Sequence, residues 1–279
     1  KREAMNDEER AWLNRLIRDP AALRTERFRS FSVDQQAFIL ETTSDYLLMR
    51  GSGGGAEGEP FREKNKSILA ARSQLKVPPR EIPIEPYVKQ PDLGHGTSRI
   101  GFGAGWRNDR AFEEINARAA YQDLLDPDYG YTPNAQIEVM SFAVRHYYNE
   151  SQARLERFSP LNMTSISPID SLFQAPSWTL NLGMNTINYG SCQLCTNGYF
   201  NGGVGGAVES TLLGRQIFYA MAEVEADASK AYEDDYRIGG GGTFGMLANL
   251  TERWKLVASV TYLRFPLGEK SEDFRWFVG

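Results

Sequence analysis

The chain has two histidines, and His95 is the one that lies close to other reactive side chains. It stands in the run GHGTSR, where Ser98 and Arg99 follow, so a serine–histidine pair of the hydrolase type is one interpretation. A nucleophile and a base this close on one segment have poor mutual geometry, and the sequence contains no strained nucleophile turn. We therefore expect no catalytic residue here, and we expect His95 and Arg99 to hydrogen-bond neighbouring loops.

Carboxylates cluster in the run YQDLLDPDYG, which begins at Tyr121. Asp123, Asp126 and Asp128 could suggest a calcium site, but their spacing lacks the alternation and the glycine position of a calcium loop. The Asp-Pro pair is typical of a turn, so we predict no metal and no cofactor. The residues expected to make interactions here are His95, Ser98, Arg99, Tyr121, Asp123 and Asp126.

The only two cysteines, Cys192 and Cys195, form a single C-x-x-C. A structural zinc site would need four ligands, and no second pair is present. We favour a short-loop disulfide in an oxidising envelope compartment, with two free loop thiols as the alternative. The glycine runs GGVGG and GGGG are not followed by Lys-Ser/Thr, so close strand packing explains them better than a phosphate loop.

The run RIGFGAGW, which begins at Arg99, indicates the element that positions these residues. An extended strand places Ile100, Phe102 and Trp106 on one face, and Arg99, Arg107 and three glycines on the other. A water-facing side made almost entirely of glycine is rare in a soluble sandwich, whereas a tight barrel interior needs small residues and paired charges. We interpret the run as the first strand of a membrane-spanning β-barrel.

The two-residue period returns in later segments, so the sequence predicts a mainly β, antiparallel outer-membrane β-barrel of about ten strands (range roughly 8–12). The later segments are 111–120, 135–148, 153–166, 177–189, 199–210, 218–225, 236–248, 254–262 and 274–278. Apolar residues occur in both registers of 135–166, so the facing of those two strands stays open. Several segments carry an aromatic residue at one end of the apolar face, as expected of a girdle at the lipid headgroups.

The inward positions of the predicted barrel carry charges of both signs. In a barrel of this size they must pair across the lumen, because an unpaired buried charge is costly. We therefore expect a plugged interior and not a diffusion channel. The predicted charge network consists of Arg99, Arg107, Glu114, Arg118, Glu209, Glu223, Glu225, Arg237, Lys255 and Arg275.

The N-terminal part has a helical period. Segments 5–18, 32–50 and 60–75 are predicted helices, so residues 1–75 form a small helical module. Residues 76–91 contain five prolines and are predicted to be an extended linker, and residues 92–279 form the barrel. An even strand count places the linker and Gly279 on the periplasmic side, together with two long connections, 121–134 and 167–176.

Composition excludes several classes of protein. The formal net charge of -5 provides no basic footprint, so nucleic acid is not an expected partner. No run of about 18 apolar residues is present, so no transmembrane helix is predicted. Lys1, Arg2 and Glu3 do not begin a signal peptide, and the last residues lack the terminal aromatic of a barrel assembly signal. We therefore expect a mature chain or a fragment without its export signal.

The runs GHGTSRIGFGAGWR, INARAAYQDLLDPDYGYTPNAQIEVMSFAVRHYY and RLERFSPLNMTSISPIDSLFQAPSWTLNLGM carry a family resemblance. The chain resembles the C-terminal region of bacterial envelope proteins whose N-terminal part is similar to the periplasmic domain of Lnb, the intramolecular lipoprotein N-acyltransferase. The resemblance implies that the catalytic-type cysteine and histidine lie in a part missing here, and neither Cys192 nor Cys195 matches that cysteine. Gln122 stands where the family run AYHDLLDP has histidine, which weakens proton transfer at that position.

These observations favour a non-catalytic outer-membrane anchor or scaffold in a Gram-negative bacterium. Its expected contacts are outer-membrane lipid and either another envelope protein or the missing periplasmic domain. One alternative is an envelope enzyme that acts on lipid or lipoprotein at the periplasmic leaflet through His95 and Ser98. A soluble β-barrel or sandwich that binds an apolar ligand is the third possibility.

Overall fold

The computed structural model describes residues 1–52, 58–82, 96–128, 131–148, 152–170, 172–211, 214–250 and 254–279. The chain divides into two compact units, Lys1–Pro86 and Tyr87–Gly279, and the division falls inside the predicted linker. Positions 83–95 lie outside the described residues. The interaction candidate His95 and most of the predicted linker therefore have no structural description.

Helices make up the first unit. Reciprocal capping boxes begin two of them: the Asn6 side chain accepts from the Glu9 N–H at 2.8 Å while the Glu9 carboxylate accepts from the Asn6 N–H at 3.0 Å, and Ser32 and Gln35 do the same. Within the described residues the helical elements are η1 (Arg2–Ala4), α1 (Asp7–Arg18), η2 (Pro20–Arg24), α2 (Glu26–Arg29), α3 (Val33–Gly51) and α4 (Glu59–Ser73). The three predicted helices are confirmed, with boundaries shifted by at most two residues.

A small apolar core holds the helical unit together. The Trp12 ring packs against Phe28 and Phe31 with centroids 5.4 and 6.0 Å apart, and Phe38 is buried beneath the guanidinium of Arg80. The other buried side chains of this core include Leu13, Leu16, Ile39, Leu40, Leu47 and Ile68. No helix within the described residues is both long and apolar enough to cross a bilayer.

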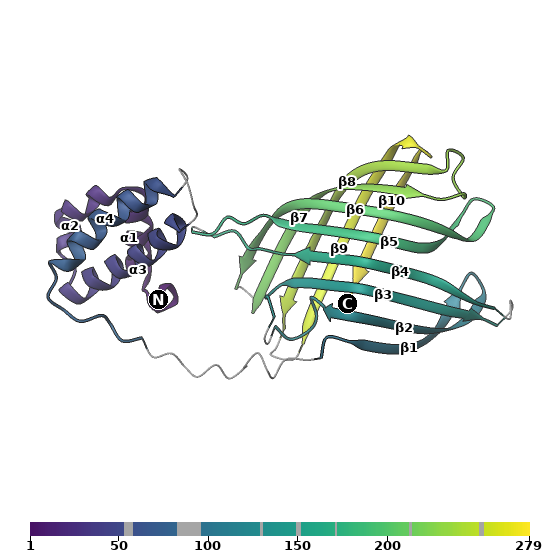
Figure 1. The fold of residues 1–279 in the computed structure, drawn as a ribbon, viewed down its shortest axis with the longest axis horizontal. Helices are drawn as coiled ribbons and strands as arrows, with labels where there is room; N and C mark the ends of the chain where they lie inside the picture. Colours follow the sequence, from purple (N-terminus) through teal and green to yellow (C-terminus); the bar gives the residue numbers. More distant parts are fainter. Residues whose placement is uncertain are drawn as a thin grey trace. The chain divides into compact units, whose positions relative to one another are not determined.

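The second unit is a single antiparallel sheet, in which consecutive strands are hydrogen-bonded neighbours from β1 to β10. Its strands, within the described residues, are β1 (Arg99–Arg107), β2 (Arg110–Gln122), β3 (Ala135–Tyr147), β4 (Gln152–Ser165), β5 (Ser177–Tyr189), β6 (Cys192–Ser210), β7 (Arg215–Ala228), β8 (Tyr236–Asn249), β9 (Lys255–Gly268) and β10 (Ser271–Val278). Figure 1 shows the sheet curling, so that β9 and β10 pass behind the strands in the middle of the chain. The prediction of ten antiparallel strands is confirmed.

The two faces of the curled sheet differ in chemistry, as the two-residue period predicts. Large apolar side chains on the outer face are exposed: Phe102 is 80% exposed, Trp276 73% and Trp254 71%. On β7, Val224 is 59% exposed on the outer face, whereas Glu225 and Asp227 turn inward and are 5% and 3% exposed. The usual distribution of a water-soluble sheet is therefore inverted, with apolar surface outside and charge inside.

Strands β3 and β4 explain why the facing of 135–166 could not be predicted. Met140 has a φ of +52°, and the inward side chains change parity across it: Glu138 lines the interior on one side, and Ser141 is fully buried on the other. Glu156 is an extra residue in β4, where pairing with β3 shifts by one position. A second shift in register occurs between β4 and β5. A period of two cannot continue through these irregularities.

Two inward glycines make room for aromatic rings on the neighbouring strand. Gly105 pairs with Phe112, and a Cβ atom on Gly105 would lie 2.8 Å from the ring. Gly245 pairs with Tyr219 in the same way, and the Tyr219 ring occupies the space of a side chain. At these two positions glycine lets a cross-strand ring lie over the bare backbone, whereas at Gly205 and Gly241 a Cβ would meet the backbone of the neighbouring strand.

The two ends of the sheet have different connections (Figure 1). We call the end with the connections after β1, β3, β5, β7 and β9 the hairpin end, since three of these connections have only two residues between strands. The opposite end, the plug end, carries the long connections 123–134 and 166–176. These connections are long because they contribute side chains to the interior of the sheet.

Candidate functional site

A cavity of about 810 Å³ lies inside the curled sheet. Its walls contain residues from β2 to β10, so the sheet surrounds it on most sides. Most of the lining side chains are asparagine, threonine, arginine or carboxylate, and Tyr199, Tyr219 and Phe277 add aromatic rings. Volumes of this size are typical of sites for small molecules.

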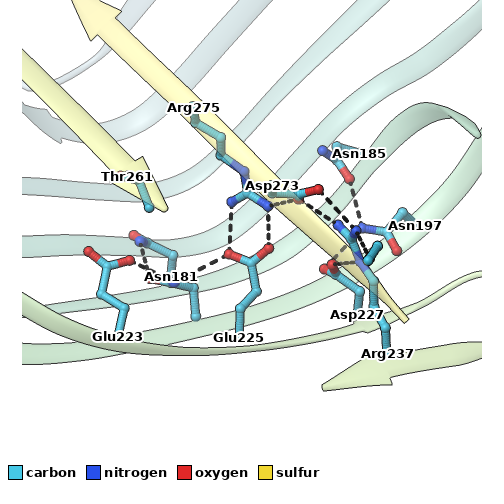
Figure 2. A network of polar contacts seen from close by, with 12 residues as sticks. Asn181, Asn185, Asn197, Glu223, Glu225, Asp227, Arg237, Thr261, Asp273 and Arg275 are labelled. Atoms are coloured by element: carbon cyan, nitrogen blue, oxygen red, sulfur yellow. Dashed lines mark hydrogen bonds and ion pairs between the residues drawn. The ribbon is translucent and has the colours of Figure 1, made fainter. Parts of the chain in front are cut away.

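Arg237 on β8 is the centre of an ion-pair network near the hairpin end (Figure 2). Its Nε donates to Asp227 Oδ2 at 2.7 Å, and its Nη2 donates to Asp273 Oδ2 at 2.9 Å. The guanidinium also lies over the Phe265 ring, 4.0 Å from the centroid. The side chains of Arg237 and Asp227 are 9% and 2% exposed, so this pair is shielded from solvent.

Arg275 on β10 extends the same network towards β7. Its two Nη atoms donate to the two carboxylate oxygens of Glu225 at 2.9 and 2.6 Å, a bidentate geometry. Its Nη2 also donates to Asp273 at 2.7 Å. The network joins β7, β8 and β10 (Figure 2), so it stabilises the curvature of the sheet and also pairs the buried charges.

A row of amides crosses the floor of the cavity from strand to strand. Consecutive register partners form this asparagine ladder, which consists of Glu138, Asn162, Asn181, Asn201 and Glu225. Asn162 donates to Glu138 at 3.2 Å, Asn181 donates to Asn201 at 3.2 Å, and Asn201 donates to Glu225 at 3.3 Å. Asn201 also donates to Glu223 at 3.0 Å.

The β3 end of the ladder has unused hydrogen-bonding capacity. Glu138 is 4% exposed, and its Oε1 has no hydrogen-bond partner within the described residues. Arg118 Nε lies 3.6 Å away and Arg157 Nη2 lies 4.0 Å away, which balances the charge without a hydrogen bond. The Oδ1 atom of Asn181 is likewise buried and has no partner there.

A second ion-pair cluster lies between β1 and β4. Arg145 donates to Glu114 at 2.7 Å and to Glu156 at 3.1 Å, and Arg107 is also bonded to Glu156. Arg107 reaches further, to the Thr186 carbonyl of β5 at 2.9 Å. The extra residue in β4 thus places a carboxylate between two arginines.

An apolar plug closes the plug end of the interior. Leu124, from the connection after β2, packs against side chains of β6 to β9, and the partly buried Leu125 packs against the same cluster. The plug consists of Leu124, Ile166, Ala207, Ile217, Tyr219, Met221, Leu247 and Val257. Lys255 fixes it, since its Nζ donates to the Asp126 carbonyl at 2.6 Å and to Asp128 at 2.8 Å. Leu124 of one long connection and Ile166 of the other therefore turn inward at this end of the sheet.

The predicted interaction candidates at the plug end have structural roles where they are described. The Ser98 hydroxyl donates to the Ala119 carbonyl at 2.9 Å, and Arg99 is exposed at the start of β1. Asp123 and Asp126 shape their own turn: Asp123 accepts from the Leu125 N–H, and Asp126 accepts from the Asp123 N–H, both at 3.0 Å. Tyr121 lies in β2, near its C-terminal end.

The predicted charge network is divided among four places. Arg118, Glu223, Glu225, Arg237 and Arg275 line the cavity. The cluster between β1 and β4 holds Arg107 and Glu114, while Lys255 contacts the plug. Glu209 forms a partly exposed pair with Arg215 at 3.2 Å, and Arg99 is outside the ion pairs present among the described residues. At the β5–β6 hairpin, the structure joins Cys192 and Cys195 in a disulfide.

Several residues of the site were missed by sequence reasoning. Glu138, Arg145 and Glu156 lie in the two strands whose facing stayed open. The inward asparagines carry no charge, so the search for paired charges passed over them, although the alternation of β5 and β6 already placed Asn181 and Asn201 inside. Within the described residues, no group of three potential metal-binding side chains is present.

The turn between β7 and β8 covers part of the hairpin end. Tyr232 is 3% exposed, and its hydroxyl donates to Asn197 at 3.3 Å. Burial raises the pKa of Tyr232 to about 12, and the nearby Asp227 carboxylate acts in the same direction. The phenol therefore stays neutral and remains a donor over the physiological range.

Comparison with known proteins divides the chain at the same place. A family model described as Domain of unknown function (DUF7840) matches residues 88–278, and another described as Domain of unknown function (DUF7842) matches residues 1–83. No curated protein and no solved structure matches the chain. The two matched ranges correspond to the two compact units within a few residues.

Proposed function

We propose that this chain, which belongs to the family described as Domain of unknown function (DUF7840), is an outer-membrane β-barrel that anchors and positions a periplasmic domain or partner protein. The exposed apolar outer face carries the proposal. Apolar patches on soluble monomers rarely exceed a few hundred Å². A face that spans ten strands, with polar groups inside, is the arrangement that lipid requires.

Closure of the sheet is part of this proposal. In the closed form β1 would meet β10, which removes the two strand edges that an open sheet would expose to hydrocarbon. The outer positions of these two strands are among the most exposed apolar ones, with Ile100 at 71% and Phe274 at 68%. A lipid-facing seam between them is consistent with both exposures.

The apolar plug and the interior ion pairs favour a scaffold over a channel. The apolar plug closes one mouth, and Arg237 and Arg275 tie strands together across the interior. A water-filled pore would require charged walls without such cross-links. The plug end, with the connections 123–134 and 166–176, is the surface we propose for docking in the periplasm.

The resemblance to envelope proteins with an Lnb-like domain supplies the proposed partner. On that basis the helical unit would lie in the periplasm, and the anchored domain would be the catalytic-type part found in those relatives. In the enzymatic alternative Ser98 would act with His95; the Ser98 hydroxyl donates to the Ala119 carbonyl, and His95 lies outside the described residues.

The test is whether the protein behaves as an integral outer-membrane barrel. The full chain, exported in a Gram-negative host, should stay in the outer-membrane fraction after a urea or carbonate wash, and its gel migration should change on boiling. Phe244→Arg, on the outer face at 60% exposure, should reduce membrane insertion by about 2–4 kcal/mol. Exposed Phe173 lies outside the strands, so Phe173→Arg is the matched control.

A soluble, monomeric full chain in buffer without detergent would refute the proposal. Release by the alkaline wash, with unchanged migration after boiling, would have the same meaning. An insertion defect of equal size in Phe173→Arg would show that the outer face has no special role.

A further inference from the structure

We propose that the interior cavity binds a small, neutral, polyhydroxylated ligand, a mono- or disaccharide, on the asparagine ladder. This inference concerns the inside of the sheet and does not depend on whether the outer face contacts lipid. The evidence is the set of buried polar atoms without partners, the balance of charge and the shape of the cavity.

The buried acceptors without partners indicate that the ligand must provide hydrogen-bond donors. Glu138 Oε1 and Asn181 Oδ1 are buried acceptors that have no donor within the described residues, and both side chains line the cavity. A buried acceptor without a partner is unfavourable, so each atom favours a ligand that brings a donor. Asn162 lies between them in register, so the two acceptors are on one continuous row.

The charges of the cavity walls disfavour an anionic ligand. Two arginines, Arg118 and Arg157, lie 3.6 and 4.0 Å from Glu138, so this carboxylate can accept a hydrogen bond but does not need a cation. On the other wall, Arg275 pairs with Glu225 and Asp273, and Arg237 pairs with Asp227 and Asp273. Glu223 accepts a hydrogen bond from Asn201. The cavity walls hold the six carboxylates Asp123, Glu138, Glu223, Glu225, Asp227 and Asp273 against the four arginines Arg118, Arg157, Arg237 and Arg275, which disfavours an anion.

A hydroxyl group fits this environment because it donates and accepts at once. The ladder presents amide and carboxylate groups in a row, and threonine hydroxyls such as Thr179 and Thr164 continue the polar surface beside it. Tyr199 and Phe277 provide flat apolar surfaces on which the carbon-bound hydrogens of a sugar ring can pack. The volume of about 810 Å³ suits one or two sugar rings with water.

The plug gives the cavity one closed end. Leu124 seals the side of the long connections, so a molecule on the ladder would be retained and not passed across the sheet. A retained sugar corresponds to a binding site or a structural ligand and not to transport.

The experiment is calorimetric titration of the purified full chain with maltose and with N-acetylglucosamine, together with saturation-transfer NMR. A detergent without a sugar headgroup, such as an amine oxide, prevents competition by the detergent itself. We expect saturable binding of at least one probe. Asn181→Ala and Glu138→Gln should each weaken it by about tenfold or more, since each removes or weakens an acceptor.

The matched control is Asn116→Ala, an asparagine on β2 that hydrogen-bonds Glu114 outside the cavity walls. It should bind like the parent protein. The gel migration and thermal unfolding of each variant report whether it folds, and Glu138→Gln keeps the shape if Asn181→Ala does not fold. Absence of saturable binding by either probe, which means that the cavity holds water only, overturns the proposal. So does equal weakening by Asn116→Ala.

Discussion

The plug can be tested by removing its central side chain, Leu124. Leu124→Ala deletes three carbon atoms from a side chain that is 8% exposed. At about 0.8 kcal/mol per buried carbon the transfer term is about 2.4 kcal/mol, and a residual cavity raises the total to about 3 kcal/mol. We expect this loss to fall on the local opening of connection 123–134, since Leu124 is the only plug residue that this connection contributes among the described residues.

Hydrogen exchange measures this opening directly. The Asp126 amide donates to the Asp123 carbonyl at 3.0 Å, and the Leu125 amide donates to the Asp123 carboxylate at 3.0 Å, so both report on the turn. A loss of about 3 kcal/mol corresponds to exchange that is about 100-fold faster in a peptide covering 123–128. The β6–β7 ladder should exchange at the parental rate.

Leu250→Ala is the matched control, because Leu250 also follows a strand at the plug end but is 57% exposed. Its effect on exchange should correspond to less than about 0.5 kcal/mol. The reasoning is refuted if Leu124→Ala changes exchange in 123–128 by less than about threefold while lowering the stability of the whole sheet. In that case the connection would open only together with the strands.

Three further predictions concern the interior and the hairpin end. Arg237→Met should lower the free energy of unfolding by about 3–5 kcal/mol in urea titrations, because buried Asp227 loses its partner. The control Arg215→Met removes one member of a partly exposed ion pair and should lower that free energy by less than about 1 kcal/mol. Gly245→Val should prevent the Tyr219 ring from packing and block folding, as judged by gel migration, whereas Gly103→Ala should fold, since its nearest neighbour would be 3.9 Å away. Tyr232→Phe should remove one tyrosinate component that titrates near pH 12. Because the folded pKa of Tyr232 is raised from 10.0, the parent should lose the stability linked to this group between about pH 10 and 12, and the variant should lose less stability over that range.

Much of the fold could be predicted because strand alternation is a local property. In β5 to β10 the face on which a side chain lies follows from its position in the strand. Trp178 and Asn181, for example, are an odd number of positions apart and lie on opposite faces. The facing of β3 and β4 could not be predicted, because Met140 and Glu156 interrupt the pleat. An irregularity of this kind depends on pairing with neighbouring strands, which the sequence period does not contain.

The site was less accessible to sequence reasoning. The expectation that interior charges pair agrees with Arg275 and Glu225, which lie 50 positions apart. Which charges pair depends on the curl of the sheet. The same holds for the ion pairs of Asp227 and Asp273, two residues that the predicted network left out. Sequence reasoning also did not predict the plug, because Leu124 packs in a cluster with side chains of four strands that are distant in the sequence.

The order of strands along the sheet implies an order of assembly. Every ladder joins neighbours in the chain, so hairpins can form one after another at a low entropic cost of loop closure. The contact of Lys255 with Asp128 spans 127 positions and must wait for β9 to arrive. Until then Leu124 and Leu125 remain uncovered on a nascent sheet, which makes this intermediate the stage most in need of a chaperone.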